Sequence, residues 1–306
     1  MKVDLTDTDA SKIASALVRA RRAAGSPAMG MVMTLVVVTD ENGSAATMKA
    51  ARQVAAEHPA RVLGVVHHDA KGSPRLDATV QVGQSTSGES VLLRMSGELV
   101  RHADSVVLPL LLPDSPVVVW WPGVPPDELA EDPLGRLAQR RISDSAAARN
   151  SAAALLTQAR NYQSGNTDLA WARLTPWRAL LTAALDQHPV TVNGAEVRAE
   201  RDNASAPLLA AWLRSRLGVR VDEHVSRGPG ITQVKLLTRH GDISVSRPSG
   251  GSAVFSIPGE ADRPVALRRR QVAELMAEEM RRLDEDDIYA ATVKELVAHA
   301  DDKQPA

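Results

Sequence analysis

The sequence predicts an α/β protein of two domains, with α+β character in its second half. Continuous apolar, β-rich runs at residues 31–39 and 61–67 flank a helical segment at 44–57, which predicts a first domain with a mixed sheet built on a βαβ unit. In the second half, strand patterns joined by short turns alternate with amphipathic helices, which predicts a largely antiparallel sheet packed by helices. The length of 306 residues allows a core in each domain, and we place the domains at 1–165 and 166–306.

The remaining elements of the first domain follow from periodicity. Residues 9–24 place apolar side chains at helical spacing, which predicts an amphipathic N-terminal helix. The two strands of the βαβ unit should be parallel, with a right-handed crossover. Apolar and polar residues then alternate over 76–82 and 91–95, which predicts an antiparallel hairpin with one solvated face. The segment 98–108 is predicted to be helical.

An apolar stretch at residues 106–123, VVLPLLLPDSPVVVWWPG, is predicted to form the centre of the first domain. Prolines divide it into pieces too short for a membrane span, so we expect a helix end, a turn and a central strand at 117–121. Trp120 and Trp121 end this strand. Because side chains alternate along a strand, one ring should lie in the core and the other under a helix or at a covered surface. The stretch carries no reactive group, which favours binding over catalysis.

The second half is predicted to begin with a helix at 145–162. In the block 168–186, Thr175 and Pro176 have the residue types of a helix N-cap and a first helical residue. The elements expected after this block are a strand at 190–199, a helix at 206–217, a strand at 219–225, a meander of strands at 231–239, 242–247 and 253–257, and helices at 272–283 and 289–297. The last six residues, DDKQPA, are predicted to be disordered.

Composition excludes several classes of function. The net charge of -1 gives no reason to expect nucleic acid or an acidic membrane as a partner. The absence of cysteine excludes disulfides, thiolate metal sites, a cysteine nucleophile and a thiol redox switch. The opening residues are charged and polar where a signal peptide would be apolar, and no apolar run is long enough to span a membrane. We therefore expect a cytoplasmic protein.

No nucleotide-binding, metalloprotease, nucleophile-elbow or calcium-loop spacing occurs in the sequence. The loop 83–88 could hold a phosphate, but its flanks predict a hairpin turn. His67 to Asp69 close a parallel strand, where ligand sites of α/β proteins usually lie, yet adjacent histidines on a strand point to opposite faces. Asp222 and His224 share a strand face and could form an acid–base pair, although a surface pair is the favoured interpretation without a nucleophile motif.

Three charged clusters remain. The acidic residues 284–287 precede a helix and are explained most simply as a helix cap. Arg140 and Arg141, and the arginine run 268–270, could each bind a phosphate or an acidic partner surface, and solvated arginines are the simpler interpretation. From the residues alone we expect a binding protein with no catalytic residue, no metal site and no cofactor.

Three blocks, LLPDSPVVVWWPG, RRISDS and DLAWARLTPWRALLTAALD, resemble in order and spacing the OpcA family of glucose-6-phosphate dehydrogenase assembly proteins, in its actinobacterial form. The resemblance covers roughly residues 30–300. It implies a non-catalytic partner that binds glucose-6-phosphate dehydrogenase, promotes its active oligomer or raises its activity, and so supports NADPH production in the oxidative pentose phosphate pathway. Some family members are linked to thiol redox control, which a chain without cysteine cannot carry in its own thiols.

The resemblance identifies no residues of the contact surface, so we predict them on physical grounds. Protein interfaces use large aromatic anchors and arginines. The predicted partner-binding residues are Trp120, Trp121, Trp171, Arg173, Trp177 and Arg178. The alternative is that the tryptophans join the two domains. Two competing functions stay open: a sugar-phosphate- or nucleotide-binding sensor using the strand end at His67 with Arg140 and Arg141, and an unrecognised enzyme using Asp222 and His224.

Overall fold

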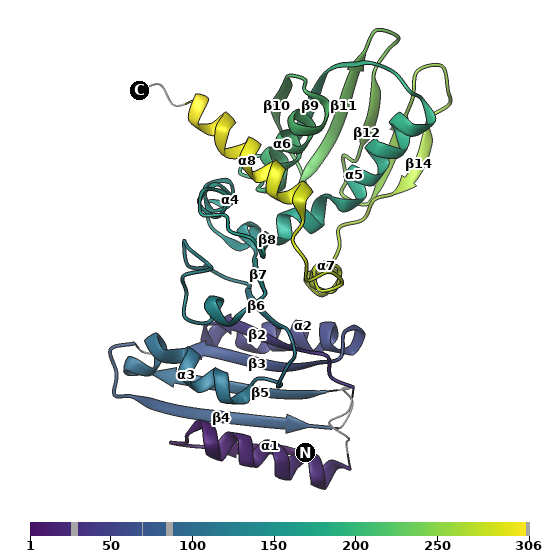
Figure 1. The fold of residues 1–306 in the computed structure, drawn as a ribbon. Coiled ribbons are helices and arrows are strands. Elements are labelled where there is room, and N and C mark those ends of the chain that lie inside the picture. The colour runs from purple at the N-terminus through teal and green to yellow at the C-terminus, as the bar shows by residue number, and fades with distance from the viewer. Residues whose placement is uncertain (26–29, 69, 84–87, 304–306) are drawn as a thin grey trace. The chain divides into compact units, whose positions relative to one another are not determined.

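The computed structural model describes residues 1–25, 30–68, 70–83 and 88–303. Asp69, most of the loop 83–88 and the last three residues of the predicted disordered tail lie outside the described residues. The chain divides into two compact units. Unit 1 comprises residues 1–144, 165–167 and 272–284, and unit 2 comprises residues 145–164, 168–271 and 285–306. Each unit contains one mixed sheet, which confirms the predicted α/β fold of two parts (Figure 1). The predicted boundary at residue 165 stays a prediction.

Unit 1 is built on an eight-stranded sheet with the strand order β1-β4-β5-β3-β2-β6-β7-β8. Its strands are β1 (Lys2–Leu5), β2 (Met33–Thr39), β3 (Ala60–His67), β4 (Arg75–Val82), β5 (Glu89–Ser96), β6 (Val117–Trp121), β7 (Arg140–Ser143) and β8 (Asn166–Asp168). Its helices are α1 (Ala10–Ala24), α2 (Glu41–Glu57), α3 (Ala103–Val107) and α7 (Val272–Glu279), with short 3-10 turns at η1 (Gly97–His102), η2 (Leu108–Leu110) and η3 (Gly135–Leu137).

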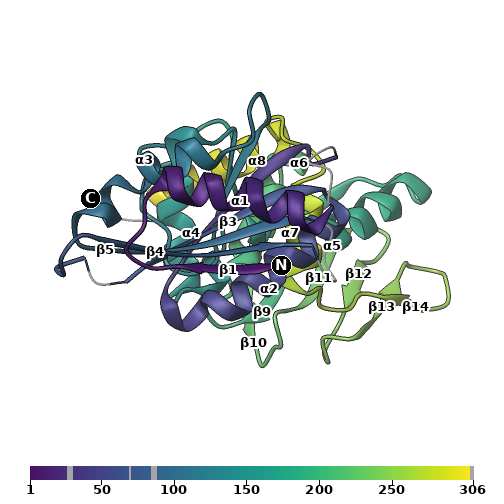
Figure 2. The ribbon, with the colours of Figure 1, turned by 90° about the horizontal axis from the view of Figure 1, so that it is seen from below.

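The centre of this sheet is parallel, as the βαβ pattern predicts. β2 pairs in parallel with β3 on one side and with β6 on the other. Helix α2 follows β2 and packs so closely on β3 that a Cβ on Gly64 would lie 2.5 Å from the Met48 sulfur. The other face is covered by α1, whose Ile13 and Leu17 share a core with alternate residues of β2, β3 and β6. Figures 1 and 2 show α1 running alongside β4.

In unit 1, one strand was not predicted and one expectation needs correction. The polar opening residues form a strand, β1, which pairs with β4 at the sheet edge, where Thr79 donates to Asp4 at 2.8 Å. A short edge strand with charged side chains tolerates this composition because only one of its sides must pair. The helix predicted at 98–108 is a 3-10 turn followed by the short helix α3 and another 3-10 turn. Pro109 cannot donate a backbone hydrogen bond, so the α-helix stops before it.

Unit 2 is built on a six-stranded sheet with the order β10-β9-β11-β12-β13-β14. Its strands are β9 (Val192–Glu200), β10 (Val221–Ser226), β11 (Ile231–Thr238), β12 (Ile243–Ser246), β13 (Ser252–Ser256) and β14 (Arg263–Ala266). Its helices are α4 (Ser151–Arg160), α5 (Leu169–Gln187), α6 (Ser205–Leu217) and α8 (Asp287–Asp302), with a 3-10 turn η4 (Ser145–Ala147).

The unit 2 sheet is largely antiparallel, as predicted. Strands β9, β11, β12, β13 and β14 form antiparallel pairs, and only β10 lies parallel to its neighbour, β9. Helix α6 supplies the crossover that a parallel pair requires. Alternate residues of β9, such as Ala195 and Val197, enter a core formed with α5, α6 and α8 (Figure 1). The intervening residues Glu196 and Arg198 stay half-exposed.

Helix α5 differs from its prediction. It begins at Leu169, seven residues before Pro176, and continues through that proline. Asp168 is the actual N-cap and accepts a hydrogen bond from the Ala170 backbone N–H at 2.8 Å. Pro176 has no N–H to donate to the Ala172 carbonyl four residues earlier, and the Arg270 guanidinium donates to that carbonyl instead. Tertiary structure thus supplies the bond that the proline removes. Within the described residues, no helix is long and apolar enough to cross a bilayer.

Candidate functional site

Two of the blocks that carry the family resemblance meet at one buried carboxylate in unit 2. Asp168, from the DLAW block, is fully buried. One of its oxygens caps α5, and the other accepts hydrogen bonds from the Ser145 backbone N–H at 2.9 Å and the Ser145 hydroxyl at 2.6 Å. Ser145 is the last residue of RRISDS. Since a buried carboxylate is stable only when hydrogen-bonded, this contact explains why both blocks need these residue types.

Trp171 connects the start of α5 to the start of α8 within unit 2. Its indole N–H donates to Asp286 at 2.7 Å. The other Asp286 oxygen accepts the Tyr289 backbone N–H at 2.9 Å, so Asp286 caps α8, which confirms the capping role predicted for the acidic cluster. The rings of Trp171 and Tyr289 lie 5.5 Å apart. One carboxylate therefore positions both an aromatic ring and a helix terminus.

Two arginines of unit 2 rest on tryptophan rings. The Arg178 guanidinium carbon lies 3.5 Å from the Trp171 ring centroid, and Arg178 also donates to the Thr175 hydroxyl at 3.0 Å. The guanidinium carbon of Arg247, which follows β12, lies 5.0 Å from the Trp177 centroid. These cation–π contacts hold both guanidinium groups in place. Arg178 lies off the apolar face that periodicity predicts for α5, and Arg247 lies outside α5.

The predicted partner-binding residues separate into two groups. The four tryptophans, Trp120, Trp121, Trp171 and Trp177, are at most 3% exposed. Trp121 belongs to the core that α1 covers, and Trp120, one residue earlier on the strand, points to the opposite face. Arg173 and Arg178 are half-exposed. The role of all six residues in partner binding stays a prediction. Of the six, the two arginines are the ones whose side chains a partner could reach.

The predicted anion contacts of unit 1 lie in a polar network. Arg140 is buried, pairs with Glu279 at 2.8 Å and donates to the Asp284 carbonyl at 3.0 Å. Arg141 donates to the Asn166 side chain at 2.6 Å. Burial raises the pKa of the Glu279 carboxyl, and Arg140 opposes that shift. Anion binding by Arg140 and Arg141 stays a prediction, while their observed contacts hold β7 to α7 and β8 inside unit 1.

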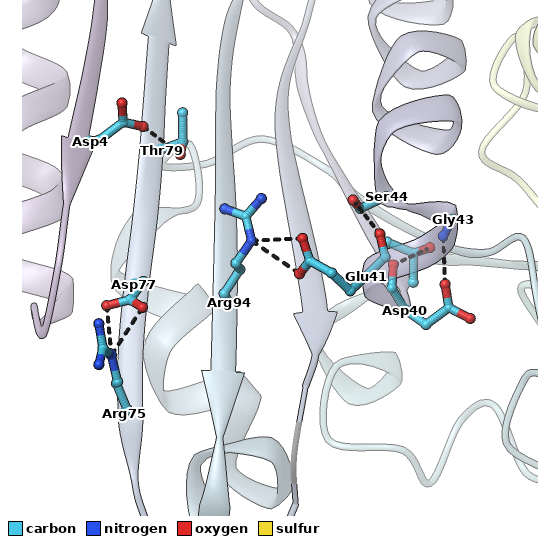
Figure 3. Close-up of polar contacts among 10 residues, drawn as sticks. Asp4, Asp40, Glu41, Gly43, Ser44, Arg75, Asp77, Thr79 and Arg94 are labelled. Carbon is cyan, nitrogen blue, oxygen red and sulfur yellow. Dashed lines mark hydrogen bonds and ion pairs between the residues drawn. The ribbon is translucent and has the colours of Figure 1, made fainter.

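The strand ends at the centre of unit 1 form the place where α/β proteins commonly bind nucleotides. The chain reverses its direction across the sheet between β2 and β6, and ligands of open parallel sheets bind at such a point. Here Asp40 follows β2 and accepts the Gly43 backbone N–H at 2.6 Å, so a carboxylate occupies the N-terminus of α2. The next residue, Glu41, pairs with Arg94 of β5 at 3.0 Å (Figure 3). Both acidic groups disfavour a phosphate at this helix end.

Among the described residues, neither His67 nor His224 forms a hydrogen bond with an acidic side chain. His67 at the end of β3 is half-buried, and burial lowers the pKa of its imidazole against the opposing charge of Asp132. His224 is exposed on β10, and Asp222 bonds Arg220 at 2.9 Å. Among the described residues, no three histidine or acidic side chains gather as metal ligands.

Sequence reasoning missed a buried charge cluster at the start of β3 in unit 1. Arg61 pairs with Glu89 of β5 at 3.0 Å and donates to the Leu110 carbonyl at 2.6 Å, and Arg21 of α1 contacts the same carboxylate. Burial lowers the pKa of Arg61, and Glu89 opposes this shift. The available signal was a charged residue inside a run predicted to be buried on both faces.

Comparison with known families assigns both halves of the chain. Residues 51–160 match the model of the N-terminal domain of the glucose-6-phosphate dehydrogenase subunit family. Residues 164–293 match the model of the C-terminal domain of the same family. The match to the N-terminal domain precedes the match to the C-terminal domain along the chain.

One curated relative is a protein of Synechococcus elongatus described as an OxPP cycle protein, OpcA. It is 31% identical over 139 residues, which are 42% of this chain and 31% of the relative. The matched region thus spans less than a third of the relative's length.

Solved structures show only distant similarity. A 3-ketoreductase from Actinomadura kijaniata has a TM-score of 0.45 and 8% identity over 88% of this chain and 96% of its own. An oxidoreductase from Sinorhizobium meliloti has a TM-score of 0.41 and 12% identity over 88% of both chains. Similarities at this level carry no argument about fold or activity.

Proposed function

Because this chain belongs to the OpcA family of glucose-6-phosphate dehydrogenase assembly proteins, we propose that it is a non-catalytic cytoplasmic protein that binds glucose-6-phosphate dehydrogenase and favours its active oligomer or conformer. In this role it supports NADPH production by the oxidative pentose phosphate pathway. The observation that carries the proposal is that matches to both domains of this assembly family occupy residues 51–160 and 164–293.

The geometry of unit 1 supports a non-catalytic role. A dehydrogenase would need to hold a dinucleotide, and α/β proteins do so by placing its pyrophosphate at a helix N-terminus after a central strand. In this chain Asp40 occupies that helix end and Glu41 stands beside it. A phosphate placed there would meet carboxylates in place of free backbone N–H groups, which argues against a dinucleotide-dependent enzyme.

An assembly factor acts through linkage. It binds the active conformer or oligomer more tightly than the inactive one and shifts the population by that difference in binding free energy. A ten-fold shift needs a difference of only about 1.4 kcal/mol. Such a difference can come from a few contacts, so no large rearrangement of the assembly factor itself is required.

We place the contact surface at the beginning of α5, where Arg173 is half-exposed. Arg178 lies on the same helix, but it stacks on Trp171 and its replacement would disturb unit 2 as well. Arg173→Ala should weaken enzyme activation about ten-fold, the loss typical of an interface arginine, with an unchanged Tm. The matched control is Arg201→Ala, an exposed arginine in the turn after β9. Equal activation by both variants and the parent protein would remove Arg173 from the contact.

The proposal as a whole is tested by titrating the purified protein into purified glucose-6-phosphate dehydrogenase of the same organism. NADPH formation and molar mass by light scattering are followed together. A higher rate with a joint species establishes an activating partner, and a change in the enzyme's own oligomer identifies assembly as the mechanism. No joint species and no rate change at micromolar concentrations would refute the proposal.

A further inference from the structure

A pocket of about 430 Å³ opens in unit 2 between α5 and the strand β14. Its apolar walls are Pro176, Ala266 and Leu267, and two arginines, Arg268 and Arg270, complete the lining beside them. This volume lies within the range of pockets that hold small molecules. Arg268 is exposed, so a ligand in solution can reach the pocket's charged side.

Arg270 is fixed by the proline inside α5. Because Pro176 lacks an N–H, the Ala172 carbonyl is left without its helical donor, and the Arg270 guanidinium donates to it. Pro176 and Arg270 both line the pocket. The proline therefore provides a wall of the pocket and also the acceptor that holds one of its cations in place. A guanidinium carries five N–H groups in a planar fork, so one side chain can serve several acceptors at once.

A third arginine lies behind the pocket wall. Arg247 is 6% exposed and donates to the Leu267 carbonyl at 2.9 Å and to the Ile231 carbonyl at 3.2 Å. No carboxylate among the described residues lies within ion-pair distance of it. Burial lowers the pKa of Arg247, and the positive charge of Arg269 lowers it further. The pocket wall is thus bonded to a buried cation that forms no ion pair within the part of the chain that the structure describes.

The other arginines that the structure describes as buried each have an acidic partner. Arg61 pairs with Glu89 at 3.0 Å, and Arg140 pairs with Glu279 at 2.8 Å. Buried charges are ordinarily paired because an unpaired one loses its hydration without compensation. Ser252 adds a hydroxyl at the edge of the pocket. Two guanidiniums and a hydroxyl beside apolar walls suit an anion attached to an organic group.

We propose that this pocket binds a small organic phosphate, with the phosphate between Arg268 and Arg270 and the organic portion against Pro176, Ala266 and Leu267. Guanidinium groups match phosphate oxygens in geometry and keep their charge at every physiological pH. The bound phosphate also offsets the charge of Arg247. This site is a property of the chain alone and does not rest on its binding to glucose-6-phosphate dehydrogenase, so either proposal can fail without the other.

The test is isothermal titration calorimetry of the full chain at constant ionic strength, with inorganic pyrophosphate and ADP as probes. Both should bind, and ADP more tightly, because its base and ribose can cover the apolar walls. Arg268→Gln should weaken ADP binding about ten-fold, as expected for loss of one charge-assisted contact. Arg269→Gln is the matched control, since it removes the same charge from the adjacent residue, which pairs with Glu200 and does not line the pocket.

A second variant separates the site from general attraction to a basic surface. Ala266→Glu places a carboxylate in the pocket at an exposed position and should abolish binding of both probes with little change in Tm. Absence of binding by pyrophosphate and ADP up to about 1 mM would overturn the proposal. Equal weakening by Arg268→Gln and Arg269→Gln, or undiminished binding to Ala266→Glu, would overturn it as well.

Discussion

Arg140 in unit 1 and Arg247 in unit 2 are both almost fully buried, yet the two units accommodate their charge differently. Arg140 meets the buried carboxylate of Glu279 at 2.8 Å. Arg247 meets two backbone carbonyls and the face of Trp177. A carboxylate neutralises the guanidinium, whereas carbonyl dipoles and an aromatic face stabilise it and leave its net charge in place.

The difference teaches what each arginine can do. In unit 1, the charges of Arg140 and Glu279 neutralise each other, so this pair stabilises the packing of β7 against α7. The uncompensated charge of Arg247 raises the local potential beside a pocket that already contains Arg268 and Arg270. We therefore interpret Arg247, which forms no ion pair among the described residues, as part of the proposed ligand site, and Arg140, which pairs with Glu279, as structural.

The largest effect is expected from Arg140→Met. This variant leaves the Glu279 carboxylate buried without its cation and should lower the free energy of unfolding by about 3–5 kcal/mol. Chemical denaturation measures the loss. In a double-mutant cycle, adding Glu279→Gln should recover much of it, because the unpaired charge is then gone. If Arg140→Met lost less unfolding free energy than Arg247→Met, the difference drawn between the two buried arginines would be wrong.

The Arg140→Met effect should also depend on pH. Because burial raises the pKa of Glu279, the folded state binds this proton more tightly than the unfolded state, and the contribution of this group to stability falls as pH rises through the raised pKa. Without Arg140, which lowers the pKa of Glu279, that pKa should rise further. The destabilisation should therefore be greater near pH 8 than near pH 5.

An intermediate effect is expected from Arg247→Met. It leaves the Leu267 and Ile231 carbonyls without their donor but strands no charge, so the loss in unfolding free energy should be about 1–3 kcal/mol. The loss should be the same near pH 5 and near pH 8, since no titrating partner is involved. Denaturation at both values is the measurement. A steep pH dependence would show that an acidic group compensates Arg247 after all.

The smallest effect is expected from Arg178→Met. This half-exposed side chain loses its stacking on Trp171 and its bond to Thr175, worth about 0.5–2 kcal/mol together. Tm by calorimetry should fall slightly, and Arg178→Lys should recover only part of the loss, because an ammonium cannot stack as a planar guanidinium does. If Arg178→Met lost as much unfolding free energy as Arg140→Met, the exposure of an arginine would not determine how strongly its replacement destabilises the protein.

Much of the fold could be predicted from the sequence because the signals are local. The continuous apolar runs at β2 and β3 predict parallel central strands, and alternation predicts the hairpin of β4 and β5. The acidic cluster before α8 predicts a cap, and Asp286 provides it. The resemblance blocks led to the family without any structure. The predictions of single strands and of the helix cap each use residues that lie within one strand or turn of one another.

The features of the candidate sites required the tertiary structure, because their partners are remote in sequence. Arg140 and Glu279 are separated by 139 positions, and Arg270 lies 98 positions from the carbonyl that it caps. Thr175 and Pro176 have the residue types of a helix start, but Asp168 already caps the helix and Arg270 satisfies the carbonyl that the proline leaves open. Residue types and periodicity determined the elements of this protein. Folding decided which charges are compensated, because compensation depends on which side chains meet in space.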